Sequence, residues 1–155
     1  MKTLRVLIVD DERMVQELFG YYIKTAADRY HLAGAIKGAA NAEVACLREQ
    51  IDLILMDVCT ADNESGLAAA ASIKKKYPQV KIIMVTSAPE VNFLKKARAA
   101  GAESFWYKEV GTESLLSVMD RTMAGEHVWP AATPVVPVGL ADSDDFTPTE
   151  LKVLG

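Results

Sequence analysis

Four short apolar runs in the sequence each end in polar residues. The runs cover residues 4–9, 51–56, 80–85 and 104–107 and consist mainly of Val, Ile, Leu and aromatic residues. Runs with so little polar alternation are typical of strands buried on both faces, as in a parallel sheet covered by helices. The polar residues that follow these runs are Asp10 with Asp11, Asp57, Thr86 and Lys108.

Helical patterns separate the runs. After the first run, apolar residues recur at helical spacing at Val15, Leu18, Phe19, Tyr22, Ile23 and Ala26. Further helices are predicted over 40–50, 67–77, 90–100 and 112–124, with Val44 and Leu47 pointing inward in the first of these. A weaker apolar segment, residues 30–37, predicts one more strand. We therefore predict an α/β fold with a doubly wound, five-stranded parallel sheet in the flavodoxin-like order 2-1-3-4-5.

This strand order places the first and third strands side by side, so that Asp10 and Asp11 face Asp57. In open parallel sheets, ligands bind outside the carboxyl ends of the strands, near the point where the strand order reverses. Each polar residue alone has an ordinary structural role, for example as a helix cap or a solvated charge. Their coincidence at one edge predicts a crevice that also receives Thr86 and Lys108.

The chemistry of such a crevice is set by its charge. Three carboxylates close together raise each other's pKa, so either one takes up a proton or a divalent cation such as Mg²⁺ binds through oxygen. Lys108 can pair with a carboxylate or with a phosphoryl oxygen, and the Thr86 hydroxyl can donate to a second phosphoryl oxygen. These are the groups needed to hold an aspartyl phosphate.

Composition excludes several other functions. The net charge of −4 and the pI near 5.2 give no basic surface for nucleic acid. No apolar run approaches the ~20 residues that cross a bilayer, and the N-terminus lacks a signal-peptide cleavage site. Cys46 and Cys59 have no metal-binding spacing, so we expect free thiols in a reducing cytoplasm.

The sequence changes character after residue 125. Residues 126–145 are rich in Pro and Asp without apolar periodicity, which predicts a linker. Residues 146–155 resemble the start of a helix, with Thr147 as the cap, Pro148 in the first turn and Glu150 three residues after the cap. We expect one domain over 1–125, a linker over 126–145 and the beginning of a truncated second domain over 146–155.

The motifs together resemble the receiver domain of bacterial two-component response regulators, over about residues 4–124. The motifs that carry the resemblance are Val9-Asp10-Asp11-Glu12, Leu55-Met56-Asp57-Val58, Val85-Thr86-Ser87, and Gly101-Ala102 followed by Phe105 and Lys108. The residues from Phe146 to Leu154 are similar to the start of a LuxR/NarL (FixJ)-type helix-turn-helix output domain.

The resemblance implies that Asp57 is a phosphoacceptor that receives its phosphoryl group from a sensor histidine kinase. It also implies that Mg²⁺, for which Mn²⁺ could substitute, binds Asp10, Asp11, Asp57 and the backbone carbonyl of Cys59. The family would make this chain a signalling switch and not a turnover enzyme.

The resemblance further implies a switch pair, Thr86 and Phe105, with Lys108 on the phosphoryl group. Phosphorylation would promote a homodimer that regulates transcription by binding DNA through the missing output domain, with no role for a membrane. The loop after Asp57 departs from the family, because Ala61 stands where proline is usual and Gly66 comes one place late.

The resemblance also implies that the residues nearest a hydrolytic water are Cys59 and Ala88, two positions after the phosphoacceptor and after the switch hydroxyl. A thiol bonds water poorly and alanine not at all, so we expect slow self-dephosphorylation.

Two other functions fit the fold less well. A phosphatase or phosphotransferase with an aspartate nucleophile, of the haloacid dehalogenase type, would need a general acid where Cys59 stands. A nucleotide-binding module would need a glycine-rich turn after the first strand, where this sequence has Asp10-Asp11-Glu12.

Overall fold

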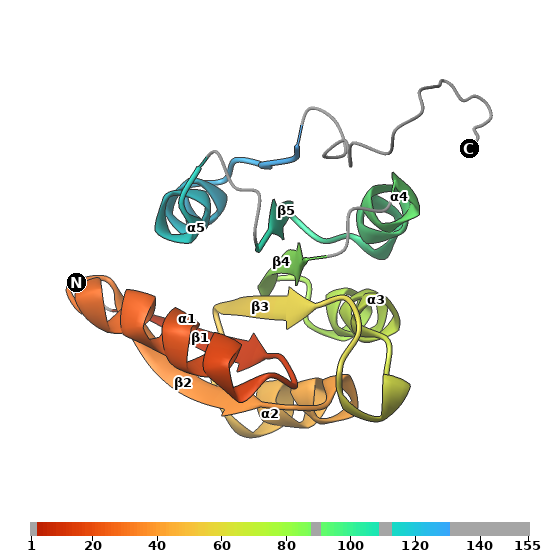
Figure 1. Cartoon of the computed structure of the whole chain (residues 1–155), viewed down its shortest axis with the longest axis horizontal. Coiled ribbons are helices and arrows are strands. Elements are labelled where there is room, and N and C mark those ends of the chain that lie inside the picture. The colour runs from red at the N-terminus through yellow and green to blue at the C-terminus, as the bar shows by residue number, and fades with distance from the viewer. Residues whose placement is uncertain (1–2, 88–90, 109–112, 131–155) are drawn as a thin grey trace, which may run out of the picture.

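The computed structural model describes residues 3–87, 91–108 and 113–130 (Figure 1). Five parallel strands form one sheet in the order β2-β1-β3-β4-β5. The strands are β1 Leu4–Val9, β2 Tyr30–Ile36, β3 Leu53–Asp57, β4 Lys81–Thr86 and β5 Ser104–Tyr107. The structure confirms both the predicted fold class and the predicted strand order.

Helices and short 3₁₀ turns connect the strands. They are α1 Arg13–Thr25, η1 Ala39–Asn41, α2 Ala42–Arg48, η2 Ala61–Asn63, α3 Gly66–Lys76, α4 Val91–Ala100 and α5 Leu115–Met123. Helix α5 is predicted from residue 112 but begins at Leu115, because Ser114 caps it by accepting a hydrogen bond from the Ser117 N–H at 3.2 Å. None of the described helices is long and apolar enough to cross a membrane.

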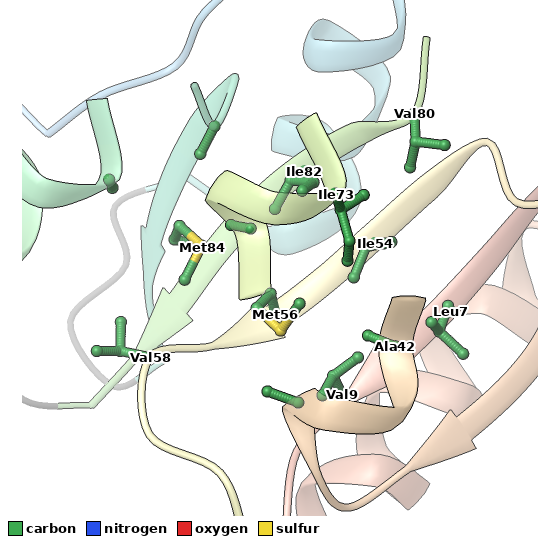
Figure 2. Close-up of a cluster of buried hydrophobic side chains, with 14 of the residues drawn as sticks. Leu7, Val9, Ala42, Ile54, Met56, Val58, Ile73, Val80, Ile82 and Met84 are labelled. Carbon is green, nitrogen blue, oxygen red and sulfur yellow. The ribbon is translucent and has the colours of Figure 1, made fainter. Parts of the chain in front are cut away.

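Both faces of the sheet are covered. Alternate residues along each strand point to opposite faces, so that Leu7, Ile54 and Met84 pack under α2, α3 and α4 (Figure 2). Their neighbours Ile8 and Leu55 pack on the other face, under α1 and α5. Figure 1 shows the two helical layers on either side of the sheet. The strand ends are therefore where polar groups can meet a ligand.

Helix α2 buries a different face from the predicted one. The prediction that Val44 and Leu47 point inward is wrong, since these side chains are 44% and 74% exposed. Ala42 is buried instead, and Ala45 and Cys46 pack partly against the core. In a helix of two turns, either stripe satisfies the helical period, and the smaller side chains let the helix approach the sheet closely.

The loop after β3 is bonded to the connection between β2 and α2. The buried Thr60 hydroxyl accepts a hydrogen bond from the Ala39 N–H at 2.8 Å and donates to the Glu64 carbonyl oxygen at 3.1 Å. Within the loop, Asp62 adopts the left-handed conformation, with φ of 61°. This turn folds the loop back on itself, and the loop returns to the sheet at α3.

Gly66 begins α3 beside the backbone of Asp57. Its N–H donates to the Val58 carbonyl oxygen at 2.8 Å. A Cβ atom on Gly66 would lie 1.8 Å from the Asp57 carbonyl oxygen, far inside contact distance. The glycine that comes late in the sequence pattern is therefore the one that packs against the end of β3.

Residues 126–130, the first of the predicted linker, lie along the edge of the sheet at β5. The Val128 carbonyl oxygen accepts a hydrogen bond from the Phe105 N–H at 2.9 Å, and the Val128 N–H donates to Ser104 Oγ at 3.0 Å. The remainder of that linker and the predicted helix start at Thr147 lie outside the described residues.

We expect Gly66→Ala to destabilise the protein by about 3 kcal/mol, the upper end of the usual cost of overpacking, because the clash is with backbone. The matched control is Gly20→Ala in α1, where the new Cβ would meet only Leu32 Cδ2 at 3.7 Å. The control should gain about 0.5–1 kcal/mol through helix propensity. Urea unfolding measures both, and equal stability of the two variants would contradict the close approach at Gly66.

Candidate functional site

The predicted site residues meet at the carboxyl ends of β1, β3, β4 and β5. Asp10 follows β1, Asp57 and Thr86 end β3 and β4, and Lys108 follows β5. The sheet sets this arrangement, since Asp57 pairs in register with Val85 and the Lys108 N–H donates to the Thr86 carbonyl oxygen at 2.9 Å. The side chains of Asp10, Asp57 and Thr86 are all buried.

Lys108 links two of the carboxylates. Its Nζ lies 2.7 Å from Asp10 Oδ2 and 3.5 Å from Asp57 Oδ2. The other oxygen of Asp10, Oδ1, accepts a hydrogen bond from the Glu12 N–H at 2.9 Å, which fixes the start of the β1–α1 connection. The ammonium group therefore occupies the position from which it can reach a group added to Asp57.

The site has an excess of negative charge. Carboxylate oxygens of Asp10, Asp11 and Asp57 all lie within 4.8 Å of one another, and Asp11 is exposed to solvent while the other two are buried. Three carboxyl groups thus lie together, and Lys108 is the one cation that pairs with any of them among the described residues. Oxygen ligands at this spacing suit a hard divalent cation such as Mg²⁺, and the exposed Asp11 leaves the site open to water.

Burial and charge shift two pKa values at the site. Burial raises the pKa of Asp57 to about 7, with Lys108 opposing the shift and Asp10 adding to it. Burial disfavours the ammonium of Lys108, but the carboxylates of Asp10 and Asp57 outweigh it and raise the Lys108 pKa. Burial therefore favours the protonated form of Asp57 at mildly acidic pH.

The other predicted residues lie around this centre. The Cys59 side chain is exposed, and its backbone forms a bridge with Ser65 across the loop. The Phe105 ring is 1% exposed and packs on Tyr107, so the candidate switch ring points into the core. Ala88 lies outside the described residues. The roles of the Cys59 carbonyl and of Phe105 remain predictions.

Gln16 is a site residue that the sequence analysis missed. Its side-chain amide donates to the carbonyl oxygens of Asp10 at 2.7 Å and of Ile36 at 3.2 Å, which joins the ends of β1 and β2. The sequence shows no pattern that would single out this glutamine, because its bonds go to backbone atoms.

A hollow of about 240 Å³ beside the site was also not predicted. It lies between α1 and the ends of β4 and β5, and Leu18, predicted on the buried stripe of α1, is 47% exposed at its wall. The lining residues are Glu12, Val15, Leu18, Phe19, Tyr22, Ser87, Trp106 and Lys108.

Comparisons with known proteins identify the family of this chain. The family model of the response regulator receiver domain matches residues 6–120. Response regulator protein VraR of Staphylococcus aureus is 33% identical over 129 residues, which cover 82% of this chain and 60% of that protein. The chain belongs to the family of response regulator receiver domains, and it spans about 60% of the length of the curated relatives it matches.

Solved structures share the fold. A LuxR-family two-component response regulator from Aurantimonas superposes with a TM-score of 0.75 at 23% identity, covering 82% of this chain and 89% of that one. The response regulator domain of CheB from Thermotoga maritima gives a TM-score of 0.69 at 26% identity, covering 81% and 99%. Receiver domains of this family act as switches controlled by phosphorylation.

We expect Asp57→Asn to gain stability relative to the wild type as the pH rises from about 4 to about 7. In this window native Asp57 holds a proton that the unfolded chain, at the ordinary pKa of 3.8, has lost. The free energy of unfolding of the wild type therefore falls with rising pH, and asparagine does not share the loss. Each pKa unit corresponds to ~1.4 kcal/mol, so the free energy of unfolding of the variant, relative to that of the wild type, should rise by at least about 1 kcal/mol across this window.

Urea unfolding in EDTA at about pH 5 and about pH 8 measures this gain as a difference between the two proteins. A difference between variant and wild type that is the same at both pH values would contradict a raised pKa at Asp57.

Proposed function

We propose that Asp57 accepts a phosphoryl group from a sensor histidine kinase and that this modification switches the domain between two states. The observation that carries the proposal is the buried Asp57 carboxylate, with Lys108 Nζ 3.5 Å away and Thr86 ending the adjacent strand. An Asp57 oxygen would attack phosphorus as the bond from phosphorus to the kinase histidine breaks, and that histidine would leave with the bonding electron pair and take up a proton.

A divalent cation completes the proposed site. Mg²⁺, or Mn²⁺ in its place, would be held by Asp10, Asp11, Asp57 and the Cys59 carbonyl. Bound there, it neutralises charge on the transferred phosphoryl oxygens. The cluster of three carboxyl groups supports this, since oxygen ligands that lie within 4.8 Å of one another suit such a cation.

The switch needs more than one new interaction. Phosphorylation replaces a single carboxylate charge with about −1.5 to −2. Inverting a 1:99 population needs ~5.5 kcal/mol of differential binding, while one charged hydrogen bond supplies ~1.5–3 kcal/mol. Thr86 and Lys108 must therefore act together on the phosphoryl oxygens. Phe105 would then fill the space that Thr86 leaves.

The whole protein is proposed to regulate transcription in the cytoplasm. Phosphorylation would promote a homodimer, and an output domain of the helix-turn-helix type would bind DNA. The resemblance of residues 146–154 to such a domain supports this, and the net charge of −4 argues against DNA binding by the 155-residue chain alone. The alternative remains an aspartate-nucleophile phosphatase.

With acetyl phosphate and Mg²⁺, we expect the protein to gain the mass of one phosphoryl group, and Asp57→Asn to gain none. The matched control is Asp62→Asn, which removes an exposed carboxylate from the same loop and should leave the mass gain intact. Intact-mass spectrometry measures each protein. A mass gain that persists in Asp57→Asn would contradict the proposal, and steady turnover of varied phosphate esters would favour a phosphatase.

We expect the phosphorylated protein to lose its phosphoryl group slowly, because neither Cys59 nor Ala88 orients a hydrolytic water. The double variant Cys59→Asn, Ala88→Glu should lose it about tenfold faster, which corresponds to ~1.4 kcal/mol from one added hydrogen bond. The decay of the phosphorylated mass with time measures both rates. Loss from the wild type that is equally fast or faster would show that water orientation does not set the rate.

A further inference from the structure

Residues 127–130, here called the strap, cross the edge of the sheet from one helical layer to the other. Val128 packs with the cluster under α1 and α5, whereas Trp129 packs with the cluster under α2, α3 and α4. The strap is tied to β5 through the two hydrogen bonds of Val128, and His127 Nδ1 lies 3.0 Å from the Glu103 carbonyl oxygen. Figure 1 shows this segment, in blue, running from α5 past β5.

Trp129 is held between the candidate switch ring and helix α4. Its ring centroid lies 6.3 Å from that of Phe105, with 30° between the ring planes. On α4, the Arg98 guanidinium carbon lies 4.6 Å from the Trp129 ring centroid, within the range of a cation–π interaction. A single side chain of the strap therefore contacts both β5 and α4.

The position of Trp129 depends on that of Phe105. The Phe105 ring is buried between Tyr107, at 5.3 Å between centroids, and Trp129. If Phe105 left the core, it would lose its place beside Trp129 and the strap would lose an aromatic partner. A docked Trp129 and a buried Phe105 therefore favour each other.

Covering the sheet edge does not by itself explain this contact. An unpaired edge strand is protected once a neighbouring segment bonds to its backbone, and Val128 already supplies that protection. The aromatic ring placed on Phe105 and under Arg98 adds nothing to the bonds at the edge. A contact with the switch ring suggests a role in signalling.

We propose that docking of Trp129 on Phe105 transmits the phosphorylation state of Asp57 to the part of the chain that follows Pro130. This inference rests on the proposed function, in which phosphorylation draws Thr86 away and favours the buried position of Phe105. Phosphorylation then strengthens docking of the strap, and by reciprocity docking strengthens binding of the phosphoryl group or its mimic.

Two variants with one tryptophan each test the first half of this coupling. In Trp106→Phe, Trp129 is the reporter; in Trp129→Phe, Trp106 reports from the hollow that Lys108 also lines. Each is phosphorylated with acetyl phosphate and Mg²⁺, and intact mass gives the phosphorylated fraction of the same sample. We expect acrylamide quenching of Trp129 to fall about twofold on phosphorylation.

The outcomes separate the inference from the function on which it rests. Unchanged or increased quenching of Trp129 in a protein whose mass shows phosphorylation would overturn the inference and leave the proposed function standing. No mass gain, together with no response from Trp106, would overturn both.

The reciprocal half is tested with beryllofluoride as the phosphoryl mimic, followed by fluorine NMR in the presence of Mg²⁺. Trp129→Ala should raise the concentration for half-saturation about three- to tenfold. The control is His127→Ala, which removes one hydrogen bond of the same strap but no ring contact, and it should raise that concentration by less than twofold. Equal values for the two variants would overturn the inference.

Discussion

The structure depends on one electrostatic constraint: two buried carboxylates share one partly buried ammonium. Lys108 lies 2.7 Å from Asp10 and 3.5 Å from Asp57, and Asp11 adds a third carboxylate at the solvent side. Removal of these charges from water is costly unless each finds a partner. Burial raises the pKa of Asp57, and added positive charge beside it would favour the ionised carboxylate. Under the proposed function, a cation and a phosphoryl group would therefore be complementary occupants of the same site.

The fold makes this constraint possible because it brings several strand ends, each followed by a polar residue, to one edge of the sheet. Both faces of the sheet are filled by apolar side chains, and the parallel register brings the ends of β1, β3 and β4 to one edge. The backbone is as closely fitted as the core: Gly66 packs on the Asp57 carbonyl, and Gln16 joins the ends of β1 and β2. Such contacts hold the carboxylates at fixed spacing before any ligand binds.

The sequence was sufficient to predict the strands, their order and the acidic centre. Each of these features depends on a local pattern or on the known topology of βα units. The sequence did not predict features for which the local pattern allows more than one structure and tertiary contacts decide between them. Two stripes of helix α2 satisfy the helical period, and packing against the sheet buries the stripe that contains the alanines, while Val44 and Leu47 are exposed. The Gln16 amide bonds to the backbone carbonyls of Asp10 and Ile36, and Trp129 lies within the segment whose composition predicts a linker, so neither could be found from periodicity.

A route leads from the charged edge to the sheet edge through β4 and β5. Thr86 pairs in register with Tyr107, and Met84, two residues earlier on β4, pairs with Phe105. Thr86 thus lies two residues along β4 from Met84, the residue that pairs with Phe105. The ring centroid of Tyr107 lies 5.3 Å from that of Phe105. Spatial adjacency does not establish coupling; coupling requires an element with two arrangements that both sites favour. Phe105 would meet this requirement if its buried position is one of two and if movement of Thr86 changes the space available to the ring, because Trp129 contacts that ring directly. The contact between the rings of Phe105 and Trp129 would then contribute to signalling.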